Sequence, residues 1–396
     1  MSREQQIKDA CEKFALLVGE QLERAEAIKA QGGFADFGSL KPLVIGFCGG
    51  DGIGPIISAE TRRIFTHLLA PQLERGDVVL KDIAGLTIEN RSRAGKTLPD
   101  DVLEEIKSCH VILKGPTMTP QKGDGWPNLE SANVAMRKEL DLFANLRPVR
   151  VPELDIDWAF FRENTEGAYA VGNRGFEISP DLAVDFTMIT DEGCRRIIEA
   201  AFDYAVKNGK SKVTAVTKAN IIKTTDGMFL EIFSQIGERY PAIEKEERYI
   251  DIMTAKLIDE RVRSGFQVVV LPNLYGDIIT DEAGQIQGGV GTAGSANIGK
   301  RYAMFEAIHG SADRMVAEGR GDYANPSSLL RAAAMLLAHV ELTEQARLLD
   351  RALDICQQEE AKIRITGNKG GATCREFGDY IMETLDKLAE SCEPSR

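Results

Sequence analysis

Short apolar runs alternate along the chain with longer segments in which apolar residues recur at helical spacing. Runs of this length predict buried strands, and the amphipathic segments predict helices that cover them. The alternation therefore predicts an α/β protein in which helices cover a sheet. The expected strands are Leu43–Cys48, Val111–Lys114, Asp157–Arg162, Val213–Thr217, Phe266–Leu271 and Met304–Ile308, and the expected helices include Asp191–Lys207, Thr254–Ser264, Pro326–His339 and Glu344–Lys362.

Two segments differ from this pattern. The residues from 1 to about 40 place apolar side chains at helical spacing, which predicts an added amphipathic helix with a packing role, followed by a glycine-containing linker. Residues 172–190 contain glycine, proline and alternating apolar positions. Two interpretations fit this second segment equally well: an arm that crosses to another subunit, and a surface loop with a short hairpin.

The composition excludes several classes of protein. Of 396 residues 43% are apolar, and 48 lysines and arginines against 61 aspartates and glutamates give a net charge of −13. Because this acidic chain has no long basic run, we do not expect it to bind nucleic acid. It shows neither the apolar core of a signal peptide nor the ~20 apolar residues of a membrane span, so we expect a soluble, cytoplasmic protein. Its seven cysteines lack C-x-x-C spacing, which argues against a disulfide framework or a zinc site.

Two aspartates after the predicted strand Phe266–Leu271 indicate a metal site. Asp277 and Asp281, in N-L-Y-G-D-I-I-T-D, are four residues apart and share one face if the segment is helical. A hard divalent cation such as Mg²⁺ or Mn²⁺ removes the repulsion between two such carboxylates. Asp251, a polar residue in an apolar setting, is a candidate third ligand. Taken in isolation, the pair also fits an ordinary solvated helix face.

Three arginines indicate an anionic substrate. Arg137 and Arg147 lie in one segment with Ser131 and Asn133, and Arg162 begins the sequence R-E-N-T-E-G-A-Y. Guanidinium groups pair bidentately with carboxylates, so arginines that converge on one site would bind a polycarboxylate. Each arginine alone is more often a surface charge, and only the joint pattern is informative.

Lys218 and Asn220 follow the predicted strand Val213–Thr217. They stand at the strand end where the ligand sites of α/β proteins are usually built. A lysine at such a position can act in proton transfer. A solvated lysine is the alternative interpretation.

Several loops point to a nucleotide. Gly49–Pro55 lies between a strand and a helix, where dense glycine allows the backbone to approach a phosphate or ribose closely. It lacks the G-x-G-x-x-G fingerprint, which residues 289–294 match without a preceding strand, so we do not expect a Rossmann fold. The segment His309–Ala312 follows a predicted strand, and Asn325 with Pro326 opens a helix. Such a pair of loops can frame an adenine.

Taken together, the motifs resemble the isocitrate and isopropylmalate dehydrogenase family of decarboxylating β-hydroxyacid dehydrogenases. The resemblance runs from about Leu43 to Leu385, and its motifs occur in the family's order: G-D-G-I-G-P, L-K-G-P-x-x-T-P, S-x-N-x-x-x-R, R-E-N-T-E-G-x-Y, K-x-N, N-L-x-G-D-x-x-x-D and F-E-A-x-H-G-S-A. It implies two α/β domains around a central cleft. The implied parts are a large cofactor-binding domain (43–140 and 291–396), a small domain for dimerisation, substrate and metal (141–290), and an N-terminal extension (1–42).

The resemblance also implies residue roles and a homodimer or higher homo-oligomer with shared sites. Asp277, Asp281 and the partner subunit's Asp251 would bind Mg²⁺ or Mn²⁺. Lys218, which also acts across the dimer, would take the proton from the substrate hydroxyl, and Tyr169 would reprotonate the enol after CO₂ leaves. The implied substrate-binding residues are Ser131, Asn133, Arg137, Arg147, Arg162 and Asn220, and the implied cofactor-binding residues are Thr119, Glu306, His309, Gly310, Ser311, Ala312, Arg314 and Asn325.

Ser131 and Asn133 favour isocitrate as the substrate. Isopropylmalate enzymes of the family place apolar residues there, whereas isocitrate enzymes place hydroxyl and amide groups that can bond a third carboxylate. We therefore expect oxidative decarboxylation of isocitrate to 2-oxoglutarate and CO₂ with reduction of NAD(P). The enzymatic alternative is an isopropylmalate or homoisocitrate dehydrogenase. An alternative of another class is a non-catalytic regulatory subunit, although such subunits typically lose catalytic positions that this chain keeps.

The signals for cofactor preference disagree. Arg314 stands where NAD-using members tend to have aspartate and NADP-using members a basic residue. The sequence T-G-N-K-G-G (366–371) instead resembles the NAD type, and we give NAD a slight preference. Gly49 replaces the family's usual proline and Ile56 the acid that usually follows the glycine-rich turn, but neither change removes a catalytic group.

Overall fold

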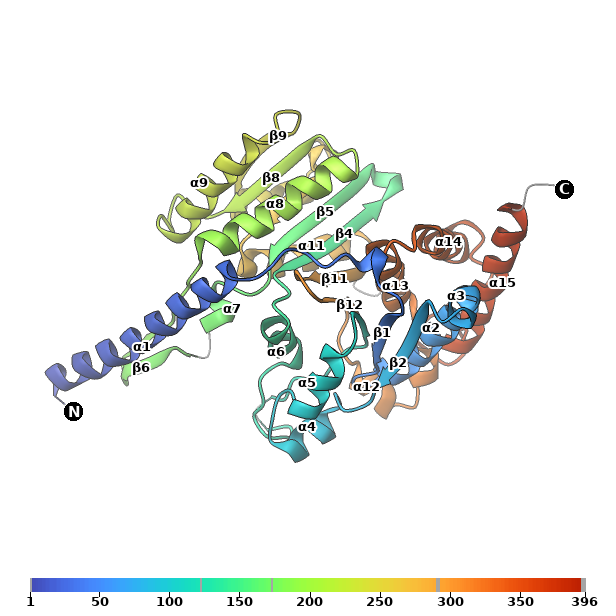
Figure 1. Cartoon of the computed structure of the whole chain (residues 1–396), viewed down its shortest axis with the longest axis horizontal. Helices are drawn as coiled ribbons and strands as arrows, with labels where there is room; N and C mark the ends of the chain where they lie inside the picture. The colour runs from blue at the N-terminus through green and yellow to red at the C-terminus, as the bar shows by residue number, and fades with distance from the viewer. Residues whose placement is uncertain (1, 122, 172–173, 290–292, 393–396) are drawn as a thin grey trace. The chain divides into compact units, whose positions relative to one another are not determined.

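The computed structural model describes residues 2–121, 123–171, 174–289 and 293–392 of the chain. For residues 391 and 392 it describes the backbone alone. Its contacts divide the chain into two compact units (Figure 1). Unit 1 comprises residues 1–33 and 143–283, and unit 2 comprises residues 34–142 and 284–396. Each unit is an α/β structure with its own set of strands.

Unit 2 contains five strands that run side by side in the order β2, β1, β3, β12, β11. The first four are mutually parallel, and β11 is antiparallel to β12. Parallel neighbours require crossover connections, which the helices of the unit supply. The strands are β1 (Leu43–Cys48), β2 (Val78–Ile83), β3 (Val111–Lys114), β11 (Gly294–Ile298) and β12 (Ala303–Ala307), and the helices are α2 (Gly54–Leu68), α3 (Ala70–Glu74), α4 (Ile88–Ala94), α5 (Asp100–Lys107), α6 (Ala132–Glu139), α12 (Asp313–Ala317), α13 (Ser327–His339), α14 (Thr343–Asp354) and α15 (Cys374–Cys392).

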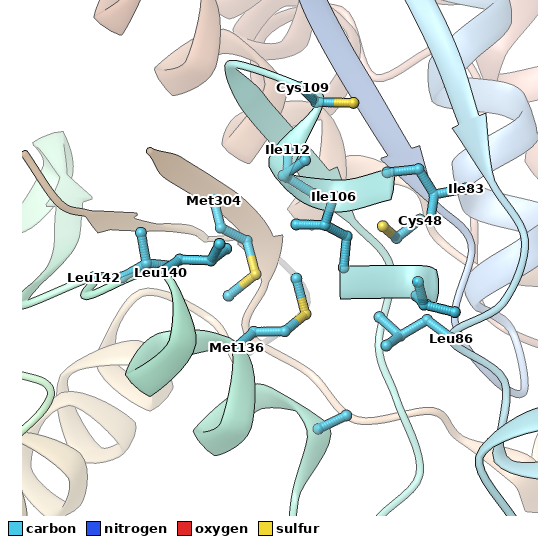
Figure 2. Packing of buried hydrophobic residues seen from close by; sticks show 12 residues of the cluster. Cys48, Ile83, Leu86, Ile106, Cys109, Ile112, Met136, Leu140, Leu142 and Met304 are labelled. Atoms are coloured by element: carbon cyan, nitrogen blue, oxygen red, sulfur yellow. The ribbon is translucent and has the colours of Figure 1, made fainter. Parts of the chain in front are cut away.

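A core cluster of unit 2 fixes the helix that carries the predicted substrate residues. Figure 2 shows Met136 of α6 packed with Met304 of β12 and with Ile106 and Ile112 of neighbouring elements. Met136 and Met304 are fully buried. Burying an apolar side chain of this size stabilises the fold by about 1.5–3 kcal/mol. This packing holds α6 and therefore sets the direction of Arg137, the next residue.

Five strands of unit 1 run side by side in the order β4, β5, β10, β8, β9, and β6 and β7 form a separate two-stranded sheet. β5, β10, β8 and β9 are mutually parallel, and β4 is antiparallel to β5. Helix α8 packs on β5, β8 and β10, and α9 packs on β8 and β9 (Figure 1). The strands are β4 (Ala144–Val151), β5 (Ile156–Glu163), β8 (Lys212–Thr217), β9 (Glu244–Tyr249) and β10 (Val268–Leu271), and the helices are α1 (Arg3–Lys29), α7 (Ala168–Val171), α8 (Asp191–Lys207), α9 (Thr225–Gly237), α10 (Ile250–Leu257) and α11 (Asn273–Ile286).

The expected N-terminal helix is present as α1, which packs beside the hairpin of β6 (Phe176–Ser179) and β7 (Leu182–Val184) (Figure 1). The rings of Phe14 and Phe186 stack with centroids 5.2 Å apart. A hairpin therefore does form within residues 172–190, of which 172 and 173 lie outside the described residues. Whether this hairpin crosses to another subunit stays a prediction.

Two of the helix predictions are wrong in their bounds. The predicted helix Thr254–Ser264 ends early, because α10 stops at Leu257 and the Asp259 carboxylate then accepts from the Arg261 amide, 3.2 Å away, in a turn. The predicted helix Glu344–Lys362 changes after Asp354 into a single π-helical stretch, Ile355–Glu359. Among the described residues, no helix is long and apolar enough to cross a membrane.

Candidate active site

The residues predicted to do chemistry in unit 1 follow the carboxyl ends of its parallel strands. Arg162 is the next-to-last residue of β5, and Lys218 directly follows β8. Asn273, which was not among the predicted site residues, follows β10. Because these three strands are parallel neighbours, their carboxyl ends lie along one edge of the sheet. The fold of unit 1 thus gathers side chains that are more than a hundred residues apart in the sequence.

The predicted acidic pair is on the helix expected for it. Asp277 and Asp281 are both on α11, four residues apart, as the sequence indicated. Arg162 forms an ion pair with Asp277, and Arg147 Nη1 lies 3.1 Å from Asp281 Oδ1. Each carboxylate therefore has an arginine that offsets its charge, and the Asp281 side chain is still 66% exposed. Exposed carboxylate oxygens of this kind suit a hard cation.

A second network holds Arg162 in place beneath this pair. Its Nε and Nη2 donate to Asn273 Oδ1 at 3.0 Å and 2.7 Å. Gly276 allows the approach, because a Cβ at that position would lie 2.6 Å from Arg162 Cβ. The glycine in N-L-Y-G-D is therefore required by the packing of α11 against β5.

Tyr169 also contacts the acidic pair. Its hydroxyl donates to Asp277 Oδ2 at 2.5 Å, and its ring lies 5.0 Å from the Arg162 guanidinium carbon. Partial burial raises the pKa of Tyr169, and the hydrogen bond to Asp277 raises it further. The phenol is thus protonated at neutral pH, which is the state a proton donor needs.

Lys218 and Asp251 form a separate pair within unit 1. Lys218 Nζ lies 2.7 Å from Asp251 Oδ1, and this hydrogen bond lowers the pKa of Asp251. Asn220 is exposed two residues beyond Lys218. Among the side chains that the structure describes, no group of three or more His, Cys, Asp or Glu residues is placed to hold a metal ion. Two of the predicted metal ligands are thus on α11, and the third, Asp251, is on α10, where it pairs with Lys218.

In unit 2 the loops after β1, β3 and β12 meet, and Asp51 joins two of them. Asp51 is buried and accepts from the Met118 amide at 2.7 Å and from Arg91 Nη2 at 3.1 Å. Gly52 has φ +59°, and a Cβ there would lie 2.0 Å from the Ser311 carbonyl oxygen. The neighbouring loops thus determine the conformation of the glycine-rich turn. The aspartate of G-D-G-I-G-P has a structural role, because its carboxylate bonds these loops to one another.

Arg137, on α6, belongs to a buried charge network that the sequence did not reveal. Its Nη2 lies 3.1 Å from Glu306 Oε1, while Lys114 Nζ lies 3.2 Å from Glu306 Oε2. Asn297 Nδ2 donates to the same carboxylate at 2.8 Å. Burial acts to raise the pKa of Glu306, but Lys114 and Arg137 outweigh it and hold this pKa at about 2. The signal for this network was the charged Lys114 at the end of an otherwise apolar strand.

The predicted substrate residues Ser131 and Asn133 are at the start of α6. Ser131 is the N-cap residue, and its hydroxyl makes no capping hydrogen bond. Asn133 Oδ1 accepts from Thr117 Oγ1 at 2.9 Å, which fixes the direction of the amide. Both side chains are partly exposed, and Thr119 on the neighbouring loop is exposed. A polar surface therefore lies beside the Arg137 guanidinium at this end of unit 2.

The predicted cofactor loop offers an unused polar atom. His309 Nε2 is buried and has no hydrogen-bond partner among the described residues, and burial lowers the pKa of this histidine. Ser311 Oγ donates to Asp313 Oδ2 at 2.7 Å, between Gly310 and the short helix that begins after Ala312. An orphaned ring nitrogen next to an open glycine suits a ligand with its own hydrogen-bonding groups, as a nicotinamide dinucleotide has.

Two further predicted cofactor residues have structural partners. Arg314, whose side chain is 90% exposed, donates to Glu318 at 2.7 Å. Asn325 Oδ1 accepts from the Ser327 amide at 3.0 Å and so helps to start α13. Neither contact excludes a second role, because both side chains keep open hydrogen-bonding positions.

Comparison with known proteins identifies the family. Residues 44–381 match the family described as isocitrate/isopropylmalate dehydrogenase. The chain belongs to this family. Both the resemblance drawn from the motifs and the expected non-Rossmann α/β fold are confirmed.

Relatives with assigned names extend the comparison. The chain is 37% identical to the protein named probable isocitrate dehydrogenase (NAD) subunit alpha, mitochondrial, of Drosophila melanogaster, over 85% of this chain and 86% of that protein. It is 38% identical to isocitrate dehydrogenase (NADP) of Rickettsia prowazekii, over 79% of this chain and 62% of that protein. Its structure is similar to that of isocitrate dehydrogenase from Methylococcus capsulatus, with a TM-score of 0.75 and 33% identity over 86% of this chain and 99% of that one.

Proposed function

We propose that this protein is a metal-dependent isocitrate dehydrogenase, which converts isocitrate to 2-oxoglutarate and CO₂ while reducing NAD or NADP. The observation that carries this choice is the polar start of α6. There, the Ser131 hydroxyl makes no capping hydrogen bond, and the Asn133 amide is oriented by its hydrogen bond from Thr117. Both residues are at the start of the helix that carries Arg137. These groups suit a third carboxylate of the substrate. A substrate with an alkyl group in place of that carboxylate would leave them unpaired.

The residues of the chain would have the following roles in this reaction. Arg137, Arg147 and Arg162 bind and orient substrate carboxylates, because each presents a guanidinium held by a neighbouring acid. Lys218 takes the proton of the substrate hydroxyl, and Tyr169 returns a proton to carbon after CO₂ leaves. Asn220 is exposed beside Lys218 and contributes to substrate binding.

Asp277 and Asp281 would hold Mg²⁺ or Mn²⁺, together with the partner subunit's Asp251. When bound, such a cation polarises a substrate hydroxyl and compensates negative charge that develops on its oxygen. Asp251 is on α10, where it pairs with Lys218, and not on α11 with the other two carboxylates. This arrangement supports a site completed by a second copy, and so a homodimer or higher homo-oligomer.

We assign the dinucleotide to unit 2 and the substrate and metal mainly to unit 1. The nicotinamide cofactor supplies the acceptor for the hydride that leaves the substrate. His309, Gly310, Ser311, Ala312, Asn325 and Thr119 would contact it, and Arg314 would lie near the adenine ribose. Glu306 would contribute to the cofactor site indirectly, by holding Arg137 and Lys114, since its carboxylate is already bonded to Lys114, Arg137 and Asn297. We retain a slight preference for NAD.

The experiment that tests this function is a steady-state comparison of substrates. Isocitrate, 3-isopropylmalate and homoisocitrate are each measured with NAD and with NADP in the presence of Mg²⁺ or Mn²⁺. We expect kcat/KM for isocitrate to exceed the others by at least about two orders of magnitude, since unpaired polar groups cost several kcal/mol. A preference for either other acid would replace the proposed substrate, and no turnover with any acid would favour a regulatory subunit.

A further inference from the structure

The loop between β5 and Tyr169 is built on two buried carboxylates. Glu163 and Glu166 are 3% and 1% exposed. The amides of Thr165 and Glu166 donate to Glu163 at 2.9 Å and 2.6 Å, so the loop folds back on its own first residue. Two buried carboxylates three residues apart repel each other strongly unless cations lie beside them.

The N-terminal helix supplies one of these cations. Arg24 of α1 donates through Nη1 to Glu166 Oε1 at 2.9 Å and through Nη2 to Thr165 Oγ1 at 3.3 Å. Arg196 of α8 donates to the same Thr165 hydroxyl at 2.9 Å. The loop is thus bonded both to the helix that follows it in unit 1 and to a helix that precedes residue 44, where the family match begins.

Glu166 is also fixed at the start of α8. The amide and hydroxyl of Thr190 donate to its two carboxylate oxygens at 2.9 Å and 2.6 Å. Gly193 makes room for it, because a Cβ there would lie 2.3 Å from the carboxylate. A carboxylate at a helix N-terminus is favoured by the helix dipole. Glu166 therefore has one geometry in which all its partners are satisfied, and Arg24 is one of them.

The backbone of Glu166 leads directly to the reactive groups. Its carbonyl oxygen accepts from Asn273 Nδ2 at 3.2 Å, and Asn273 Oδ1 in turn holds Arg162. Gly167, with φ +71°, then turns the chain toward α7, which carries Tyr169. A displacement of Glu166 would therefore move both the arginine that pairs with Asp277 and the tyrosine that bonds to it.

We propose that Arg24 is a positioning residue, which holds Glu166 and thereby sets the placement of Tyr169 and Arg162; this inference rests on the proposed function of those two residues. It gives α1 a role in catalysis in addition to packing. Misplacing a reacting group by about 1 Å can cost up to about a hundredfold in rate. Loss of Arg24 should therefore act mainly on kcat.

The test compares Arg24→Gln, Arg24→Lys and the control Glu20→Gln. Glu20 is on the same helix and pairs with Arg174, so its variant removes an α1 contact that does not reach Glu166. We expect kcat to fall about tenfold or more in Arg24→Gln, with KM for the dinucleotide unchanged, and to recover mostly in Arg24→Lys, which keeps the charge. Glu20→Gln should match the wild type.

Amide hydrogen exchange on the protein without substrate provides a readout that does not depend on activity. Arg24→Gln should speed exchange at the Thr165 and Glu166 amides, and Glu20→Gln should not. If the wild type does not turn over isocitrate but this exchange changes as expected, the proposed function fails and the positioning role stands. Unchanged kcat and exchange in Arg24→Gln, or equal losses in Arg24→Gln and Glu20→Gln, would overturn the inference. If Arg24→Gln does not fold, Arg24→Lys decides: faster exchange at the Thr165 and Glu166 amides than in Glu20→Gln, with a smaller loss of kcat, supports the role, and exchange and kcat equal to those of Glu20→Gln contradict it.

Discussion

The hydroxyl of Tyr169 and the carboxylate of Asp277 are 2.5 Å apart, and Arg162 pairs with the other oxygen of the same carboxylate. The candidate proton donor Tyr169 is thus hydrogen-bonded to the candidate metal ligand Asp277, which Arg162 holds in place. Burial and Asp277 together raise the pKa of Tyr169, which keeps its proton available at neutral pH. The Asp277 side chain therefore connects the proposed metal site with the proposed proton donor.

Tyr169→Phe should lower kcat for isocitrate by about two orders of magnitude, because loss of a general acid typically costs 10²–10⁴-fold. The KM for isocitrate should change by only a few fold, since Arg147 and Arg162 remain. Steady-state kinetics with Mn²⁺ check this. An unchanged kcat would assign the proton transfer to another group.

Mixing two inactive variants tests the shared site. Lys218→Met and Arg137→Ala homodimers should each be inactive, but a heterodimer places both changes in one site and leaves the other intact. After complete exchange at equal concentrations we expect about one quarter of wild-type activity, because half of the dimers are then mixed. If no activity returns although exchange is verified by mass spectrometry, either Lys218 acts within its own chain or the subunits do not function independently.

Ser131→Leu combined with Asn133→Leu should lower kcat/KM for isocitrate by about two orders of magnitude, since hydrogen bonds to a charged group are worth a few kcal/mol. The melting temperature should change little, because both side chains are partly exposed. Ser179→Leu, on the hairpin of unit 1, is the control for a serine outside the site. Equal kinetics in the double variant and the control would contradict the substrate assignment.

Glu163 gives a prediction about pH. Burial raises its pKa from the usual 4.5 to about 7, and the neighbouring Glu166 adds to this while Arg196 opposes it. A carboxyl with a raised folded-state pKa stabilises the fold fully below the unfolded value, and this contribution is lost as pH rises through the folded value. The loss falls between about pH 4.5 and 7 and is on the order of a few kcal/mol.

Glu163→Gln cannot ionise and should escape this loss. The free energy of unfolding of the variant should therefore rise relative to wild type between about pH 5 and 7.5, as measured by urea denaturation. Glu153→Gln, at an exposed position of unit 1, should show no such trend. A difference between Glu163→Gln and wild type that stays constant with pH would refute the assignment.

The sequence predicted the elements whose pattern is local. Strands β1 and β3 and helix α8 have the predicted bounds, because each is a clear apolar run or amphipathic repeat. β4 was missed because Arg147, Pro148 and Arg150 interrupt its apolar residues. β9 was missed because an edge strand of alternating charges has no apolar run to detect.

The candidate site shows the same division. Asp277 and Asp281 could be placed on one helix face, since their spacing and the preceding strand are local features. The pairing of Lys114 with Glu306, and of Arg24 with Glu166, joins residues far apart in the chain, and only the fold brings them together. Sequence spacing therefore indicated the candidate reacting groups, whereas the groups that hold them required the structure.

The central claim is tested most directly by identifying the products. Isocitrate is incubated with the enzyme, dinucleotide and Mn²⁺, and 2-oxoglutarate, CO₂ and reduced dinucleotide are quantified together, with and without a chelator. The account predicts equal amounts of all three products with the metal, and none when the chelator is in excess. Reduced dinucleotide without CO₂, or undiminished turnover in the chelator, would contradict it.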